Sequence, residues 1–243
     1  MNKKDFFEFS YKYIINRLDD NLFKWNNRQE SIIKKTKTGT IVISLYFNKY
    51  YSKYSFTESI SIRIDAVEKI SNYFTLKNHT EDNYTQTHAT SLSTFTNNDL
   101  KEFHFKNEEE LYEKLDIYID FLNDNGLKYL NYCDNINILA DLYINNKMDI
   151  HIASKGLFAY KTALILAILT KNNLESVAKE YKENYLIRFN DINDYSCILD
   201  TKLYEFAITG IIPDLPLSPY ESPIYQPPPK PELEALIKML EDN

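Results

Sequence analysis

Two neighbouring runs of alternating apolar residues, Thr40–Phe47 and Phe56–Ile64, constrain the fold of this chain most strongly. An alternation with a period of two places one set of side chains on each face of a β-strand. The residues Asn48–Ser55 between the runs are polar and aromatic, and we expect them to form a hairpin loop. The pattern therefore predicts an antiparallel sheet with one face on a core. The alternating apolar positions are Ile41, Ile43, Leu45 and Phe47 in the first run, and Ile60, Ile62 and Ile64 in the second.

The composition is that of a soluble globular protein. The chain has 243 residues, of which 44% are hydrophobic and 26% charged, so it is long enough for one large domain or two small ones. The first residues form no continuous apolar export signal, and Cys133 and Cys197 are not part of a CxxC motif, which favours a reducing cytoplasm. The apolar segment Gly156–Leu169 is too short to span a bilayer, so we expect no membrane association.

Residues 1–106 are expected to form the antiparallel α+β part. Outside the two central runs its predicted elements are weaker, because their apolar residues are fewer or mixed with threonine, serine and lysine. These elements are a helix over residues 3–18, a short strand at Leu22–Trp25, a helix or further strand at Asp65–Phe74, a strand at Thr87–Phe95 and an edge strand at Phe103–Phe105.

A second, helical part is expected over residues 107–212, packed with the first. Asn107 is a good N-cap, and the three glutamates after it favour the positive end of a helix dipole. Apolar residues then repeat at helical spacing up to Gly126, and Gly210 is suited to end the last helix. The further predicted helices are Asn135–Tyr143, His151–Leu169, Leu174–Phe189 and Tyr195–Ile208.

The tail is set apart by its prolines, all eight of which lie between Pro213 and Pro231. We expect an extended segment over 213–230 and an amphipathic helix over 231–243, whose apolar stripe must pack on a surface to be stable. That surface belongs to the protein itself, to a second copy in a homo-oligomer, or to another protein for which the tail is a docking peptide. The stripe consists of Leu233, Leu236, Ile237 and Leu240.

No motif for catalysis or for a cofactor is present in the sequence. The four glycines are isolated, which excludes a dinucleotide fingerprint and a P-loop. The histidines His79, His88, His104 and His151 form no helical metal-binding pair. We therefore expect no catalytic residues, no cofactor and no metal, with a hydrolase site assembled by the fold near His104, His88 or His151 as the alternative.

The charge is divided unequally along the chain. Residues 1–106 hold 16 Lys and Arg against 12 Asp and Glu, whereas residues 107–243 hold 12 against 23. An acidic half argues against nucleic acid as a partner and favours a basic protein, although solvated helix faces explain the same charges. The candidate interface residues of the acidic helix are Glu108, Glu109, Glu110, Asp116 and Asp120.

Aromatic and cationic residues are mixed in the expected hairpin loop. Tyr50, Tyr51 and Tyr54 lie there with Lys49 and Lys53. Tyrosine is favoured at protein interfaces, and aromatic rings among cations also stack with single-stranded nucleic acid. We take these tyrosines as candidate protein-interface residues, with nucleic-acid stacking and plain loop packing as the alternatives.

The order of several segments resembles a bacterial family of domains of unknown function that includes immunity proteins of polymorphic toxin systems. An aromatic first helix (DFFEFSYKYI) precedes a Trp-containing strand (LFKW), a hairpin (TIVISLYF and SISIRI) and an acid-capped helix (FHFKNEEELYEKLDIYIDFL), with LKYLNYCDNINIL after it. The resemblance covers roughly residues 3–208 and carries over no catalytic residues. It implies an α+β fold with a binding role.

Taken together, the sequence predicts a cytoplasmic, non-enzymatic protein that binds another protein. An immunity protein that neutralises a basic toxin domain by direct binding is the leading hypothesis. A hydrolase and a scaffold that docks through its proline-rich tail are the alternatives.

Overall fold

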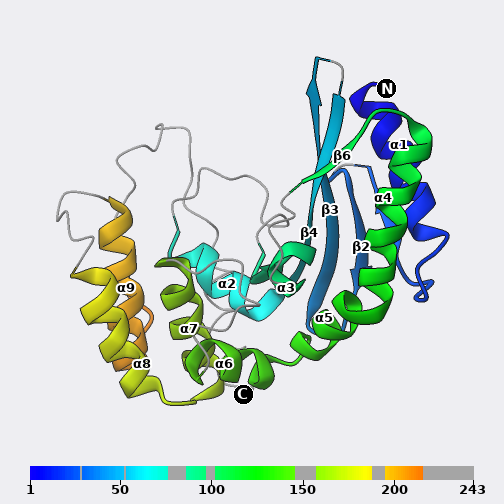
Figure 1. Ribbon diagram of the computed structural model, residues 1–243. Coiled ribbons are helices and arrows are strands. Elements are labelled where there is room, and N and C mark those ends of the chain that lie inside the picture. Colours follow the sequence, from blue (N-terminus) through cyan, green and yellow to red (C-terminus); the bar gives the residue numbers. More distant parts are fainter. Residues whose placement is uncertain are drawn as a thin grey trace. The chain divides into compact units, whose positions relative to one another are not determined.

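The structure is a computed structural model, and it describes residues 1–27, 29–51, 53–75, 86–96, 102–145, 157–187 and 195–215 (Figure 1). It confirms the mixed α+β architecture, with an antiparallel sheet in the N-terminal half and helices in the C-terminal half. The tail beyond residue 215, including the predicted helix over 231–243, lies outside the described residues. The elements are α1 Lys3–Ile15, β1 Lys24–Asn26, β2 Ser31–Lys35, β3 Gly39–Tyr50, β4 Lys53–Ile64, α2 Asp65–Tyr73, β5 His88–Thr90, α3 Leu92–Thr96, β6 Phe103–Phe105, α4 Glu108–Phe121, the π-helical segment η1 Leu122–Gly126, α5 Leu127–Cys133, α6 Ile136–Asn145, α7 Leu157–Thr170, α8 Leu174–Tyr181, the π-helical segment η2 Lys182–Leu186 and α9 Tyr195–Thr209.

The chain divides into two compact units. Unit 1 comprises residues 1–64, 86–135 and 148–154, and unit 2 comprises residues 65–85, 136–147 and 155–243. Unit 1 contains all six described strands together with α1, α3, α4, η1 and α5. The change of composition at Asn107 therefore coincides with the change from strands to helices. It is not the boundary between the two units, because the acidic helix α4 belongs to unit 1 together with the sheet.

The sheet is organised by the β3–β4 hairpin. All pairings between the described strands are antiparallel, and the strand order is β1-β2-β3-β4-β5 with β6 also paired to β4. The β3–β4 ladder runs without interruption from Gly39 opposite Ile64 to Tyr50 opposite Lys53. Asn48–Ser55 is therefore not a loop as predicted, because tyrosine suits a strand well and the ladder continues to a tight turn.

The close packing of this ladder requires glycine at its open end. A Cβ atom added to Gly39 would lie 1.8 Å from the carbonyl oxygen of Arg63, which belongs to the backbone of the neighbouring strand. No side chain at position 39 is compatible with the observed spacing of β3 and β4.

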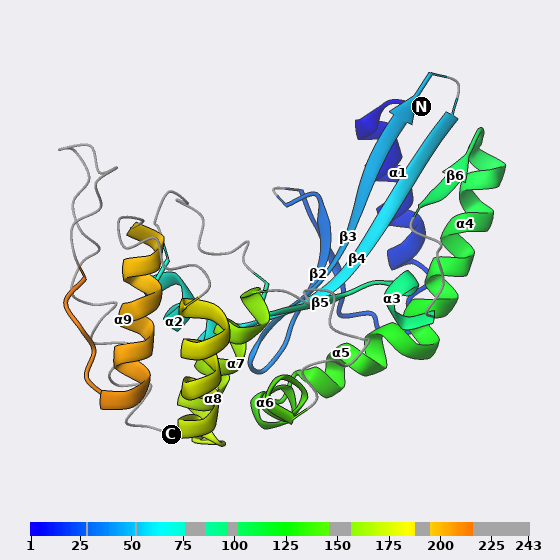
Figure 2. The same cartoon turned by 60° about the vertical axis from the view of Figure 1, so that its left-hand side comes forward.

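Helices α1 and α4 lie side by side along one face of the sheet (Figures 1 and 2). The Phe6 ring of α1 is fully buried, and its centroid lies 4.6 Å from that of Phe47, 5.9 Å from that of Phe56 and 6.1 Å from that of Phe105. Leu111 and other α4 residues at helical spacing are buried as predicted. Phe6 thus packs α1 against β3, β4 and β6.

Three shorter elements differ from the prediction. The first strand is Lys24–Asn26, and the additional strand β2 at Ser31–Lys35 was not predicted, since its two isoleucines stand beside lysines. Thr87–Phe95 is not one strand: β5 ends at Thr90, and the Ser91 hydroxyl accepts a hydrogen bond from the amide of Thr94 to begin α3.

Gly126 does not end the acidic helix. The helix continues through η1 into α5, and a Cβ atom at Gly126 would lie 3.0 Å from Cδ1 of Ile60 and 3.2 Å from the Phe121 ring. The glycine therefore allows the helix to pass close to β4. Gly210 has φ of +69° and follows α9, as predicted for a C-cap.

Unit 2 is built around α7. Its residues from Ala163 to Leu169 are all buried, as expected for a helix that is apolar on every side. The helix contacts α2, α6, α8 and α9. The part of the predicted helix that precedes Leu157 lies outside the described residues.

One carboxyl group interrupts the apolar face of β4. Glu58 stands opposite Leu45, and its Oε1 accepts a hydrogen bond of 2.7 Å from the amide of Leu92. Its Oε2 and the hydroxyl of Tyr118 are shielded from solvent, and neither has a hydrogen-bond partner among the described residues. Burial raises the pKa of Glu58 from 4.5 to about 7.

Ionisation of Glu58 is expected to destabilise the fold. The folded state holds the proton of Glu58 more tightly than the unfolded chain does. The resulting contribution to the free energy of unfolding is therefore fully present below pH 4.5 and is lost as the pH rises through 7. Glu58→Gln keeps an acceptor for Leu92 and cannot ionise. We expect it to increase the free energy of unfolding at pH 8 by about 2 kcal/mol relative to wild type, with about a quarter of that difference at pH 5.

Urea unfolding at the two pH values measures this difference, with the exposed Glu109→Gln as the control. An equal effect of Glu58→Gln at both pH values would contradict the conclusion that ionisation of Glu58 destabilises the fold.

Candidate protein-binding surface

A stripe of carboxylates covers the solvent side of α4. Glu109, Glu113, Asp116 and Asp120 are separated by four, three and four residues, so they share one face, and all four are exposed. No ion pair involving these carboxylates is found among the described residues. We call these four residues the acidic stripe. Glu113 was missed in the sequence, although its spacing from Glu109 and Asp116 would have revealed it.

Glu110 has a structural role instead. The Asn107 side chain accepts a hydrogen bond of 2.9 Å from the amide of Glu110, and the Glu110 carboxylate accepts one of 2.8 Å from the amide of Lys106. This reciprocal arrangement caps α4 and confirms the predicted N-cap. Glu108 belongs to a different feature, the groove described below.

An aromatic ridge runs beside the stripe, where α1 contacts α4. The rings of Phe9, Tyr13 and Tyr112 lie with centroids 4.6–6.2 Å apart and are half-buried. The hydroxyl of Tyr13 donates a hydrogen bond of 2.9 Å to Asp116, and the guanidinium of Arg17 lies 3.7 Å from the centre of the Tyr13 ring. The ridge therefore joins a carboxylate of the stripe to a partly exposed aromatic surface.

A groove of about 510 Å³ opens at the N-terminal ends of α1 and α4. Phe9, Tyr54 and Phe105 give it an aromatic lining, and its charged side chains are the carboxylates of Asp5, Glu8 and Glu108 together with Lys12 and Lys106. The structure thus brings two predicted interface residues, Tyr54 and Glu108, into one groove. The groove is large enough to hold a side chain of a partner.

The other two predicted tyrosines lie at the hairpin tip, outside the groove. Tyr50 is 52% exposed, and Tyr51 is fully exposed at the first position of the turn. Tyr46 on the same strand is also more than half exposed. The predicted tail residues Leu233, Leu236, Ile237 and Leu240 lie outside the described residues.

The exposed histidine of β6 does not form a nucleophile–base pair. His104 Nε2 lies 3.6 Å from Oε2 of Glu102, whose Oε1 accepts hydrogen bonds from the hydroxyl of Ser55 and from Asn48. In a serine triad the imidazole contacts the serine hydroxyl directly, whereas here the carboxylate of Glu102 lies between His104 and Ser55. His88 is buried with its Nε2 2.9 Å from the hydroxyl of Tyr129, and His79 and His151 lie outside the described residues.

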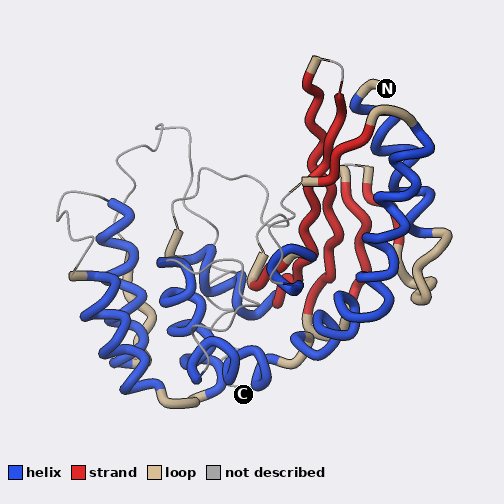
Figure 3. The backbone as a smooth tube through the Cα atoms, viewed as in Figure 1, coloured by secondary structure: helices blue, strands red, loops and turns tan. Residues whose placement is uncertain are grey.

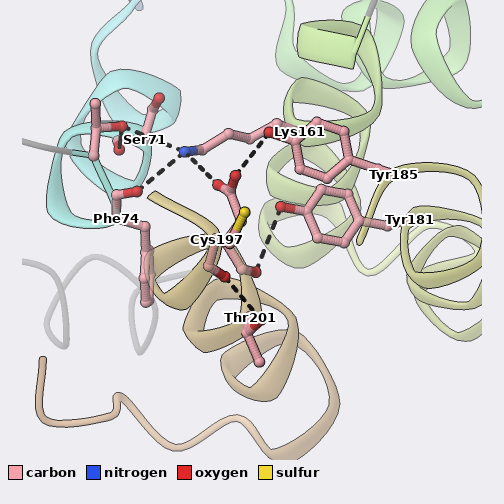
Figure 4. Close-up of polar contacts among 9 residues, drawn as sticks. Ser71, Phe74, Lys161, Tyr181, Tyr185, Cys197 and Thr201 are labelled. Atoms are coloured by element: carbon pink, nitrogen blue, oxygen red, sulfur yellow. Dashed lines mark hydrogen bonds and ion pairs between the residues drawn. The ribbon is translucent and has the colours of Figure 1, made fainter. Parts of the chain in front are cut away.

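A polar cluster joins four helical segments of unit 2 (Figure 4). The ammonium of Lys161 donates to Asp200 Oδ1 at 3.0 Å, to the carbonyl of Phe74 at 3.1 Å and to the hydroxyl of Thr75 at 3.4 Å. The other oxygen of Asp200 accepts a hydrogen bond of 2.7 Å from Tyr185. Burial raises the pKa of Tyr185, with the hydrogen bond to Asp200 as a further cause.

This cluster is a structural contact between α2, α7, η2 and α9. Every donor of Lys161 has an oxygen acceptor, and the side chains of Lys161 and Asp200 are only 14% and 12% exposed. The amine is therefore engaged within the fold and is not available to a substrate.

Three further observations bear on function. Among the residues that the structure describes, no group of three or more His, Cys, Asp or Glu side chains could hold a metal ion. Within the same ranges, no helix combines the length and the apolar character needed to cross a bilayer. Comparison with protein-family models, with curated proteins and with solved structures found no match.

Breaking the Lys161–Asp200 pair on one side is expected to be costly. Lys161→Met leaves the Asp200 carboxylate without its cation in a mostly buried position, and we expect a loss of about 3 kcal/mol in the free energy of unfolding. The double variant Lys161→Met/Asp200→Asn keeps an acceptor for Tyr185 without a buried charge, so it is expected to recover most of this loss. Thermal unfolding followed by calorimetry measures both, and equal stability of the single and double variants would contradict the pairing.

Proposed function

We propose that this protein is a non-enzymatic protein that binds a basic protein partner through the acidic stripe and the aromatic ridge. The observation that carries the proposal is the unneutralised stripe itself. Its carboxylates are spaced by three or four residues, and like charges at this spacing destabilise a helix by roughly 0.2–0.5 kcal/mol per pair. A basic partner would offset this cost, because none of the four carboxylates forms an ion pair among the described residues.

The surface beside the stripe supports the same proposal. Ile117 is 49% exposed on α4, and the residues of the aromatic ridge are half-buried. Buried apolar and tyrosine side chains supply most of the affinity of protein interfaces, while charges steer the encounter and select the partner. The α1–α4 surface offers both kinds of contact next to one another.

An immunity protein is the form of this function that we favour. The resemblance of residues 3–208 to a family that includes immunity proteins supports it, as does the lack of a catalytic motif in the sequence. In this proposal the protein acts in the cytoplasm and neutralises a basic toxin domain by covering its active site. The identity of the toxin follows from the experiment below.

A photo-crosslinking amino acid placed at Glu113 tests whether the stripe contacts a protein. In cells of the source organism we expect it to capture a protein with a basic surface, which mass spectrometry identifies. The same amino acid at the exposed Lys128 of α5 serves as the control. Identical products from both positions, or no product from position 113, would contradict the proposed interface.

Charge reversal then measures the electrostatic part with the captured partner. We expect Glu113→Lys to slow association about fivefold, because the stripe attracts a basic surface before contact, and we expect added salt to reduce the difference. Glu183→Lys makes the same change of net charge at an exposed position of η2 and should leave the rate unchanged. Stopped-flow or surface-plasmon measurements give the rates, and equal rates for the two variants would refute electrostatic steering by α4.

A further inference from the structure

Strand β3 continues beyond its neighbour β2. Strand β2 pairs with β3 only as far as Ser44, whereas the β3–β4 ladder continues to the pair Tyr50–Lys53 (Figure 3). The last residues of β3 therefore have β4 on one side and no described strand on the other. We call residues 45–50 of β3 the free edge.

The backbone groups of the free edge alternate between its two sides. In an antiparallel hairpin with a two-residue turn, the two residues that flank the turn exchange hydrogen bonds. Tyr50 and Lys53 are these residues, so every second residue of β3, counted back from Tyr50, is bonded to β4. The amides and carbonyls of Leu45, Phe47 and Lys49 therefore point away from β4.

A tyrosine hydroxyl closes the ladder between β2 and β3. The Tyr11 hydroxyl accepts a hydrogen bond of 3.2 Å from the amide of Leu45 and donates one to the carbonyl of Glu30, which precedes β2. Beyond this bridge, the amides and carbonyls of Phe47 and Lys49 have no hydrogen-bond partner among the described residues. These donors and acceptors repeat at a spacing of roughly 7 Å along the strand.

This pattern is complementary to the backbone of one extended polypeptide segment. An added antiparallel strand presents the amide and the carbonyl of every second residue at the same spacing, and strand addition is a common mode of peptide recognition. Side chains frame the free edge on both faces of the sheet. Tyr46 and Tyr50, each more than half exposed, lie on one face, and Lys49 and the half-buried Phe47 lie on the other.

The charge of the free edge favours an acidic segment. Lys49 is its only charged residue, is exposed and forms no ion pair among the described residues. Glu30 is already paired with Lys3 at 3.0 Å. The groove that Tyr54 lines carries charges of both signs, including the amino group of Met1. A carboxylate directly opposite Lys49 would therefore stabilise the added strand.

A second copy of this protein does not fit the same edge. Two free edges paired about Asn48 would bring the turn residue Tyr51 of each copy opposite Leu45 of the other. That position is taken by Glu30, whose carbonyl is bridged to Leu45 by a hydroxyl group. The edge therefore has room for a short extended segment and not for a second hairpin.

We infer that the free edge binds an extended segment of another protein as an additional antiparallel strand, with a carboxylate opposite Lys49. The segment exchanges hydrogen bonds with Phe47 and Lys49, and the residues between these positions lie beside Tyr46 and Tyr50. The free edge contains no residue of the acidic stripe or of the aromatic ridge, so this inference stands independently of the proposed function.

A designed peptide tests strand addition directly. The fluorescein-labelled sequence Thr-Ile-Glu-Thr-Val-Ile-Thr places its glutamate opposite Lys49 and its valine opposite Phe47, and we expect saturable binding to the full chain in fluorescence anisotropy. N-methylation of the glutamate or of the valine, whose amides face β3, should raise the dissociation constant about tenfold. N-methylation of the central threonine, whose amide faces away from β3, should leave it nearly unchanged.

The variant Lys49→Pro removes one donor of the free edge. The amide of residue 49 is not bonded to β4, and proline is tolerated in edge strands at such positions, so the thermal unfolding temperature should change little. We expect Lys49→Pro to raise the dissociation constant of the peptide about tenfold. Lys49→Gln keeps the amide and removes only the charge, so about a threefold increase is expected. Lys53→Gln removes a charge from β4 and serves as the control.

Three outcomes would overturn the inference. The peptide could fail to bind wild type even at millimolar concentration, or Lys49→Pro could bind it as wild type does, or N-methylation of the central threonine could weaken binding as much as N-methylation of the glutamate. A wild-type dimer in sedimentation equilibrium that Lys49→Pro dissociates would assign the edge to a second copy and would equally overturn it.

Discussion

The antiparallel pairing of β3 with β4 is the constraint on which unit 1 depends. Its ladder joins twelve residues of each strand in one register, and a shift by one residue would turn every apolar side chain to the opposite face. The carbonyl of Arg63 occupies the space that a side chain at position 39 would need. The register is thus fixed by the alternation of apolar residues along the ladder and by close backbone contact at its open end.

The proposed binding surface is a consequence of this pairing. The apolar face of the ladder carries α1 and α4, whose outer surfaces form the aromatic ridge and the acidic stripe. The same ladder, continued beyond β2, holds Tyr51 away from the rest of the sheet. Phe6 packs α1 against this ladder, since its ring centroid lies 4.6 Å from that of Phe47 and 5.9 Å from that of Phe56.

The sequence predicted the elements that have strong periodicity or a cap, and it failed where side-chain identity was misleading. The two alternating runs, the N-cap at Asn107 and the C-cap at Gly210 are confirmed. The hairpin tip was taken for a loop because tyrosine and lysine hide the alternation, and β2 was missed because only Ile32 and Ile33 mark it. The groove could not be predicted, because Asp5, Phe105 and Glu108 are brought together only by the packing of α1 beside α4.

Hydrogen exchange of the full chain carrying Gly39→Ala tests most directly whether the β3–β4 ladder holds the binding surface in place. The added methyl group must displace β3 from Arg63, so the account predicts that amide protection falls together in β3, β4, α1 and α4, relative to wild type. Thr57→Ala, at a partly exposed position of β4, would serve as a reference with nearly wild-type protection. Loss of protection confined to β3 and β4, with α1 and α4 as protected as in wild type, would contradict the account.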